Sequence, residues 1–239
     1  MIRKLNVGIQ PLADRIMTLI LQLIQAAGKT STVVEDAFLV VGSLASGQDA
    51  FYFAVMKPSD FFQTALEANF APYIQAFLQF LFPALKAHED TQLCTVAVGI
   101  IGDISRALGA QSAQYANDFM TILVENLQSD VLNRNVKISI LSCFGDIGLA
   151  IGPAFEPYLN TTMSVLSQAG QVEPNPVSHL FSIPPLRVLT STSVQLDYDL
   201  VDYVGQLREG ILEAYTGIVT GLKKTPQGKI FVTSFHATW

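Results

Sequence analysis

The chain has 239 residues, of which half are apolar and 14% are charged, and its net charge is −6 with a pI near 5.0. With an apolar fraction this high and so few charges, most of each helix must be buried or in contact with a neighbour. The acidic balance argues against nucleic acid as the main partner and favours a basic one.

A first helical hairpin is expected over residues 11–46. Pro11 opens a helix in which apolar residues recur every three or four positions. The partner helix runs from about Val34 to Ser46. The stretch that follows, residues 47–63, breaks the repeat and is the first of two predicted insertions.

The second and third hairpins, residues 69–109 and 112–152, repeat one another. Their second helices match at an offset of 43 residues, and Asn133 is a suitable N-cap for the later copy. The matching pairs are Gly102 with Gly145, Asp103 with Asp146, Ile104 with Ile147, Ala107 with Ala150, Leu108 with Ile151 and Gly109 with Gly152. Six matches at one offset indicate a true structural repeat.

A fourth hairpin is expected over residues 155–223, with its second helix from Leu207 to Lys223. The connection between its helices contains the second predicted insertion, residues 177–195, and the tail 229–239 also departs from the pattern. Both insertions end in glutamine, whose codon CAG resembles an intron acceptor site, while valine codons begin with the donor dinucleotide. We hypothesise that these segments are translated introns, which a cDNA sequence would test; genuine loop insertions are the alternative.

The repeat length predicts the fold class. A period near forty with two helices per unit is typical of a HEAT or armadillo solenoid, in which neighbouring units supply the core. We therefore predict an all-α, α-α superhelix of about four helical hairpins over residues 1–228. The apolar span Ala68–Leu85 lies inside a repeat and contains prolines and glutamines, so no membrane insertion is expected.

Cys94 and Cys143 lie on apolar helices, and the chain shows no credible export signal, so a reducing compartment is expected. The three histidines, His88, His179 and His236, have neither triad nor metal-ligand spacing. We therefore expect no enzyme, no metal and no cofactor; an unrecognised hydrolase is the minor alternative.

Seven acidic residues are candidates for binding a partner. Asp103 and Asp146 occupy equivalent positions in two successive repeats. Either their carboxylates face a basic ligand, or each accepts hydrogen bonds from the backbone of the adjacent repeat, which would form a ladder along the solenoid. A second group lies at the last helix, with its three aspartates expected before the helix begins. Its members are Asp197, Asp199, Asp202, Glu209 and Glu213. Such a cluster favours a Lys/Arg-rich helix, and an ordinary solvated face is the alternative.

Three blocks resemble the central-to-C-terminal HEAT repeats of the importin-β family, the karyopherins. They are VAVGIIGDISRALG (residues 96–109), ILSCFGDIGLAIG (140–152) and LREGILEAYTGIVTGLK (207–223). The blocks occur in the family's order, whereas a generic HEAT protein would share only the apolar stripe. The resemblance implies a fragment of a nuclear import receptor.

For such a receptor the resemblance implies three kinds of partner. The concave surface, lined by second helices, would bind the basic importin-β-binding helix of importin-α or a basic cargo. Ran in its GTP form, Ran·GTP, would bind the inner surface, and phenylalanine-glycine nucleoporins would lodge between outer helices. The implied location is the cytoplasm and nucleus, including the nuclear pore and envelope. The alternative is a generic HEAT-repeat structural scaffold of a multiprotein complex.

Overall fold

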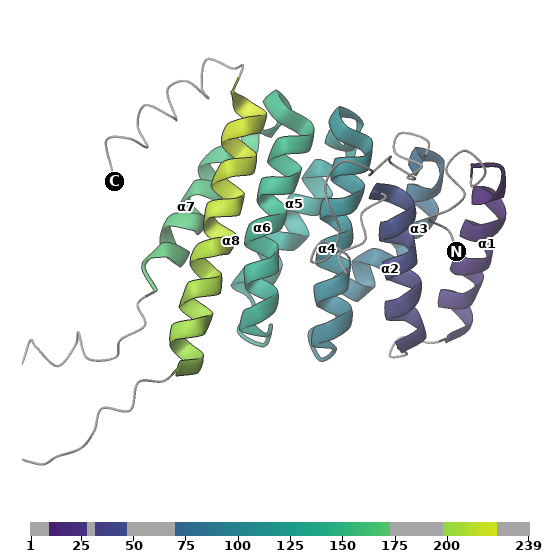
Figure 1. The fold of residues 1–239 in the computed structure, drawn as a ribbon, viewed down its shortest axis with the longest axis horizontal. Coiled ribbons are helices and arrows are strands. Elements are labelled where there is room, and N and C mark those ends of the chain that lie inside the picture. Colours follow the sequence, from purple (N-terminus) through teal and green to yellow (C-terminus); the bar gives the residue numbers. More distant parts are fainter. Residues whose placement is uncertain (1–9, 28–31, 47–69, 173–197, 224–239) are drawn as a thin grey trace, which may run out of the picture.

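The computed structural model describes residues 10–27, 32–46, 70–172 and 198–223, which form α-helices and short 3-10 segments with no strand among them (Figure 1). The helices are α1 (Gln10–Ala27), α2 (Thr32–Ser46), α3 (Ala71–Leu85), α4 (Thr91–Leu108), α5 (Ala113–Gln128), α6 (Arg134–Ile151), α7 (Leu159–Gly170) and α8 (Tyr198–Leu222). The 3-10 segments are Gly109–Ser112 and Gly152–Tyr158. The predicted all-α superhelix is confirmed. The predicted insertions 47–63 and 177–195 and the tail 229–239 lie outside the described residues.

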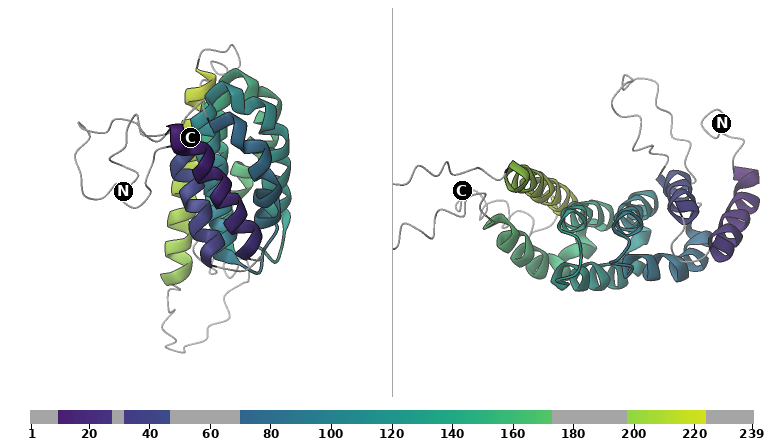
Figure 2. Two further views of the ribbon diagram at one scale, coloured as in Figure 1. Left: turned by 90° about the vertical axis from the view of Figure 1, so that its right-hand side faces the viewer. Right: turned by 90° about the horizontal axis from the view of Figure 1, so that it is seen from below.

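The helices form two layers, with α1, α3, α5 and α7 in one and α2, α4, α6 and α8 in the other (Figure 1). The right-hand view of Figure 2 shows both layers as an arc, with the even-numbered helices on its inner side. The inner helices pack closely against one another, whereas the outer helices contact each other much less. This difference in spacing curves the stack and makes the even-numbered layer concave.

Capping residues explain where the central helices begin and end. The side chain of Asp90 accepts a hydrogen bond from a backbone N–H at the start of α4, and Asn133 does the same for α6, as predicted. At the other ends Gly109 and Gly152 have φ of 52° and 54°, a left-handed conformation that favours glycine. These glycines let the chain turn from each inner helix into the next hairpin.

The core lies between the two layers and continues from hairpin to hairpin. Phe38 on α2 packs edge to face on Phe77 of α3, with ring centroids 5.0 Å apart, and so joins the first hairpin to the second. Both rings are fully buried. The ring of Phe77 on α3 is therefore part of the core.

Two long apolar stretches, Thr91–Gln128 and Arg134–Gly170, reach the mean hydropathy of a membrane span. In both, a glycine-initiated 3-10 segment turns the chain from the inner layer into the outer layer. About half of the most apolar window of each stretch is also buried inside the fold. Their apolar character is thus explained by the core that they form with adjacent repeats.

The fourth hairpin differs from the sequence prediction at both helices. Its first α-helix begins only at Leu159, because a 3-10 segment containing Pro157 precedes it. Its second helix begins at Tyr198, not at Leu207, so Asp199 and Asp202 lie on α8 and not before it. The apolar stripe continues upstream through the buried Val204, which extends the face that packs on the core.

Candidate functional site

Six of the seven predicted acids fall into two settings on the inner layer. Asp103 on α4 and Asp146 on α6 are partly buried. Four others lie on the solvent-exposed part of α8: Asp199, Asp202, Glu209 and Glu213. Asp197 lies outside the described residues. Asp103 and Asp146 were paired in the sequence because they occupy equivalent positions of two repeats. The structure places them on the adjacent inner helices α4 and α6.

The exposed acids of α8 project away from the core. Asp202, Glu209 and Glu213 are seven and eleven residues apart, which places them on one helical face. The buried Val204 and Ile211 lie on the opposite face. Since α8 belongs to the inner layer, this acidic face lies on the concave side of the arc (Figure 2). Within the described part of the chain, no ion pair is recorded for these three carboxylates.

Asp103 and Asp146 are both bound by one arginine. Arg106 Nη2 lies 2.5 Å from Asp103 Oδ1 on the same helix, and Arg106 Nη1 lies 2.5 Å from Asp146 Oδ1 on α6. Burial alone would lower the pKa of Arg106, but the carboxylates of Asp146 and Asp103 outweigh it and raise that pKa. The guanidinium therefore stays charged and joins the second and third hairpins.

The same two carboxylates fit into spaces left by glycines. A Cβ atom at Gly42 would lie 2.6 Å from Asp103 Oδ2, and one at Gly102 would lie 2.5 Å from Asp146 Oδ2. Each aspartate thus packs over a glycine of the preceding inner helix, which explains why the two residue types recur together. The ladder of backbone hydrogen bonds expected for Asp103 and Asp146 stays a prediction.

Arg106 was not identified from the sequence. The spacing Asp103-x-x-Arg106 places both side chains on one helical face, which was the available signal. The later repeat has Leu149 at the equivalent position, so the comparison of repeats concealed it. A search of each helix by itself would have found the pair.

A groove lies between the outer helices α5 and α7. Its volume is about 650 Å³, and α6 and α8 form its floor through Leu141, Tyr203 and Leu207. The walls are mostly apolar and include Val124 and Leu127 of α5 and Val165, Ala169 and Val172 of the α7 region. No pattern in the sequence indicated this groove, because its walls come from four helices of two hairpins.

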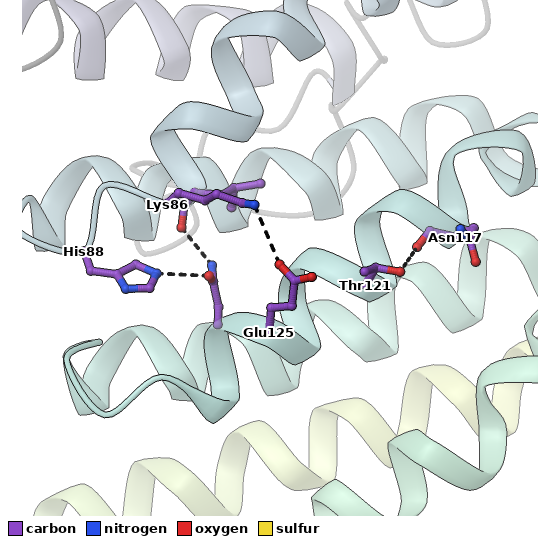
Figure 3. A network of polar contacts seen from close by, with 7 residues as sticks. Lys86, His88, Asn117, Thr121 and Glu125 are labelled. Carbon is purple, nitrogen blue, oxygen red and sulfur yellow. Dashed lines mark hydrogen bonds and ion pairs between the residues drawn. The ribbon is translucent and has the colours of Figure 1, made fainter.

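Figure 3 shows a polar network at the outer joint between the second and third hairpins. Lys86 Nζ lies 3.7 Å from Glu125 Oε2, and His88 Nε2 lies 3.0 Å from Asn126 Oδ1. Ser129 Oγ lies 3.2 Å from His88 Nδ1. Both ring nitrogens of His88 therefore have structural partners from the next hairpin. Among the described residues, no group of three or more potential metal ligands is found.

The chain is similar to importin subunit beta-1 proteins. A family model described as importin subunit beta-1-like, TPR repeats, matches residues 1–183 and 186–237. Importin subunit beta-1 of Schizosaccharomyces pombe is 40% identical over 93% of this chain, and the match spans 22% of that protein. The Arabidopsis thaliana protein of the same name is 33% identical over 92% of the chain and 21% of its own length. The chain thus spans about a fifth of these relatives.

Solved structures agree with the sequence relatives. A crystal structure of importin beta matches 99% of the chain and 24% of its own length, with 34% identity and a TM-score of 0.77. A Kap95:Nup1 complex matches with 27% identity and a TM-score of 0.73. In another match, at 26% identity and a TM-score of 0.68, Kap95p binding induces the switch loops of RanGDP to adopt the GTP-bound conformation. The last two structures each match 98% of the chain and 23% of their own length.

Proposed function

Because the chain belongs to the importin subunit beta-1 family, we propose that it works as part of a nuclear import receptor. In this role it recognises partners by shape and charge and performs no chemistry. Its inner surface binds the basic importin-β-binding helix of importin-α or a basic cargo, and the receptor moves between cytoplasm and nucleus through the nuclear pore. The observation that carries the proposal is the acidic face of α8 on the concave side of an importin-β-like solenoid.

The basic helix would bind along α8. Glu209 and Glu213 are exposed and one helical turn apart, so two lysine or arginine side chains of a ligand helix can pair with them at once. The exposed Leu212 lies beside them and offers an apolar contact to the stems of those side chains. A Lys/Arg-rich amphipathic helix matches this combination of charge and apolar surface.

Fluorescence anisotropy of a labelled Lys/Arg-rich helix, titrated with the 239-residue chain, tests this proposal. We expect saturable binding that weakens with salt and is lost in the double variant Glu209→Gln, Glu213→Gln. The matched control is Asp118→Asn, which removes a charge from the exposed surface of the outer helix α5 and should bind normally. Absence of binding by a helical chain, or equal loss in the control, would contradict the proposal.

We further propose that the groove between α5 and α7 binds phenylalanine side chains of phenylalanine-glycine nucleoporins. The apolar walls and the volume of about 650 Å³ suit aromatic rings, and the similar Kap95 is known in complex with Nup1. Val165→Glu would place a carboxylate in the groove and should abolish binding of a phenylalanine-glycine peptide. Ser167→Glu, on the exposed part of the same helix, is the control. Equal binding by both variants would contradict this site.

Ran·GTP is the third proposed partner. The similarity to the Kap95p structure with Ran supports it, and the inner surface is the face that remains open for a globular ligand. Ran·GTP would then shift the curvature of the arc toward a form that releases the basic helix. Addition of Ran·GTP to the preformed peptide complex should lower its anisotropy, and Ran·GDP is the control.

A further inference from the structure

Arg106 lies on the inner helix α4, between a carboxylate of its own helix and one of the next inner helix. Its two terminal nitrogens each lie 2.5 Å from a carboxylate oxygen, one from Asp103 and one from Asp146. The two carboxylates come from neighbouring repeats. A lysine or arginine of a partner would therefore have to displace a cation that is covalently part of the chain.

The second oxygen of each carboxylate is also enclosed. Asp103 Oδ2 lies over Gly42, and Asp146 Oδ2 lies over Gly102, each at a distance where no Cβ could fit. The side chains of these aspartates are 22% and 32% exposed, whereas Glu209 and Glu213 are in the exposed class. One oxygen of each aspartate is thus paired with Arg106, and the other packs over a glycine of the preceding inner helix.

We propose that Arg106 is an internal counter-ion that keeps Asp103 and Asp146 from binding a basic partner and confines that partner to α8. This inference rests on the proposed binding of a basic helix to the inner surface. It assigns Asp103 and Asp146 to the joint between repeats. It also makes Arg106 a residue that limits which part of the inner surface serves as a ligand site.

Chemical labelling of carboxyl groups tests the sequestration without a ligand. The 239-residue chain is treated with a carbodiimide and glycine ethyl ester, and labelling rates are measured by mass spectrometry. We expect Asp103 and Asp146 to react several-fold more slowly than Glu209 and Glu213, and to react faster in the variant Arg106→Gln. Similar labelling rates at all four acids in the unchanged chain would overturn the proposal. Labelling rates of Asp103 and Asp146 that do not change in Arg106→Gln would also overturn it, provided that the variant has the same circular dichroism as the unchanged chain.

Peptide binding supplies the second measurement. Arg106→Gln should bind the Lys/Arg-rich helix about fivefold more tightly than Lys86→Gln, a difference equivalent to one partly exposed ion pair. Lys86 is the matched control because its ion pair with Glu125 lies at the outer joint, away from the inner helices, and its removal changes the net charge equally. Equal affinities of these two variants would overturn the proposal.

Asp146→Asn separates a structural acid from a ligand-binding one. We expect this variant to keep its affinity within about twofold at moderate salt, where unpaired surface charges are screened. A loss as large as that of Glu213→Gln would mean that Asp146 contacts the partner and would overturn the proposal. If labelling gives the expected result but no variant binds the peptide, Arg106 remains a counter-ion and the proposed binding to α8 is what fails.

Discussion

At the scale of single residues, Cys94 lies where the two helices of the second hairpin, α3 and α4, meet. Its Sγ donates a hydrogen bond to the Leu85 carbonyl oxygen 3.4 Å away. Burial, with the nearby carboxylates of Asp90 and Glu89, raises the pKa of Cys94 from 9.0 to about 11. The folded chain therefore keeps this thiol neutral at a pH where the unfolded chain has already lost the proton.

This difference predicts a loss of stability in alkali. The contribution of Cys94 to the free energy of unfolding is fully present below pH 9 and is lost as the pH rises to about 11. We expect Cys94→Ala to flatten this part of the stability curve, measured by urea unfolding between about pH 8 and 11. The hydrogen bond to Asp14 raises the pKa of Tyr73 from 10.0 to about 12, so the free energy of unfolding falls further at high pH in both the unchanged chain and the variant. Parallel stability curves for the unchanged chain and Cys94→Ala would contradict the prediction.

At the scale of helices, α6 and α8 touch through their backbones. A Cβ at Gly145 would lie 2.8 Å from the Cα atom of Ala214, and one at Gly217 would lie 2.3 Å from the carbonyl oxygen of Gly145. Gly217 occupies the register that Asp103 and Asp146 hold on α4 and α6. Without an aspartate there, the last inner helix approaches its neighbour more closely than a side chain would allow.

Gly145→Ala should therefore lower the free energy of unfolding by about 1–3 kcal/mol, because the new methyl group meets backbone atoms that can only move with the helix. Gly99→Ala is the matched control. Gly99 is exposed on α4 with no atom within 4 Å of its added Cβ, so alanine should stabilise that helix by up to about 1 kcal/mol. Denaturant unfolding measures both changes, and a shift in the same direction would contradict the packing argument.

The presence or absence of a matching repeat explains which parts of the fold could be predicted from the sequence. Apolar spacing and the offset of 43 residues predicted the helices of the second and third hairpins, because stacking of similar units requires similar sequences. The predicted start of the last helix at Leu207 was wrong, because residues 198–206, which extend α8 by about two and a half turns, have no copy elsewhere in the chain to reveal them. Arg106 and the groove between α5 and α7 depend on how neighbouring helices are placed, which local patterns do not specify.

At the scale of the whole molecule, stability depends on the joints between neighbouring hairpins. Asn126 on α5 is 2% exposed, and its Nδ2 donates a hydrogen bond to the Leu85 carbonyl oxygen at 2.8 Å. That carbonyl lies in the last turn of α3, where no intrahelical donor is available. The third hairpin thus supplies a cap for the second, and the Oδ1 of the same Asn126 amide lies 3.0 Å from His88 Nε2.

Asn126→Ala should cost about 1–3 kcal/mol, because the Leu85 carbonyl is left buried with a weaker set of donors. In a solenoid, each repeat is stabilised only by its neighbours, so the loss should be local. Hydrogen exchange measured by mass spectrometry should speed up in α3, α4 and α5 and stay unchanged in α8. The control Gln128→Ala, an exposed change two residues away, should leave all helices unchanged. A uniform increase from α1 to α8 would instead show that the arc unfolds as one cooperative unit.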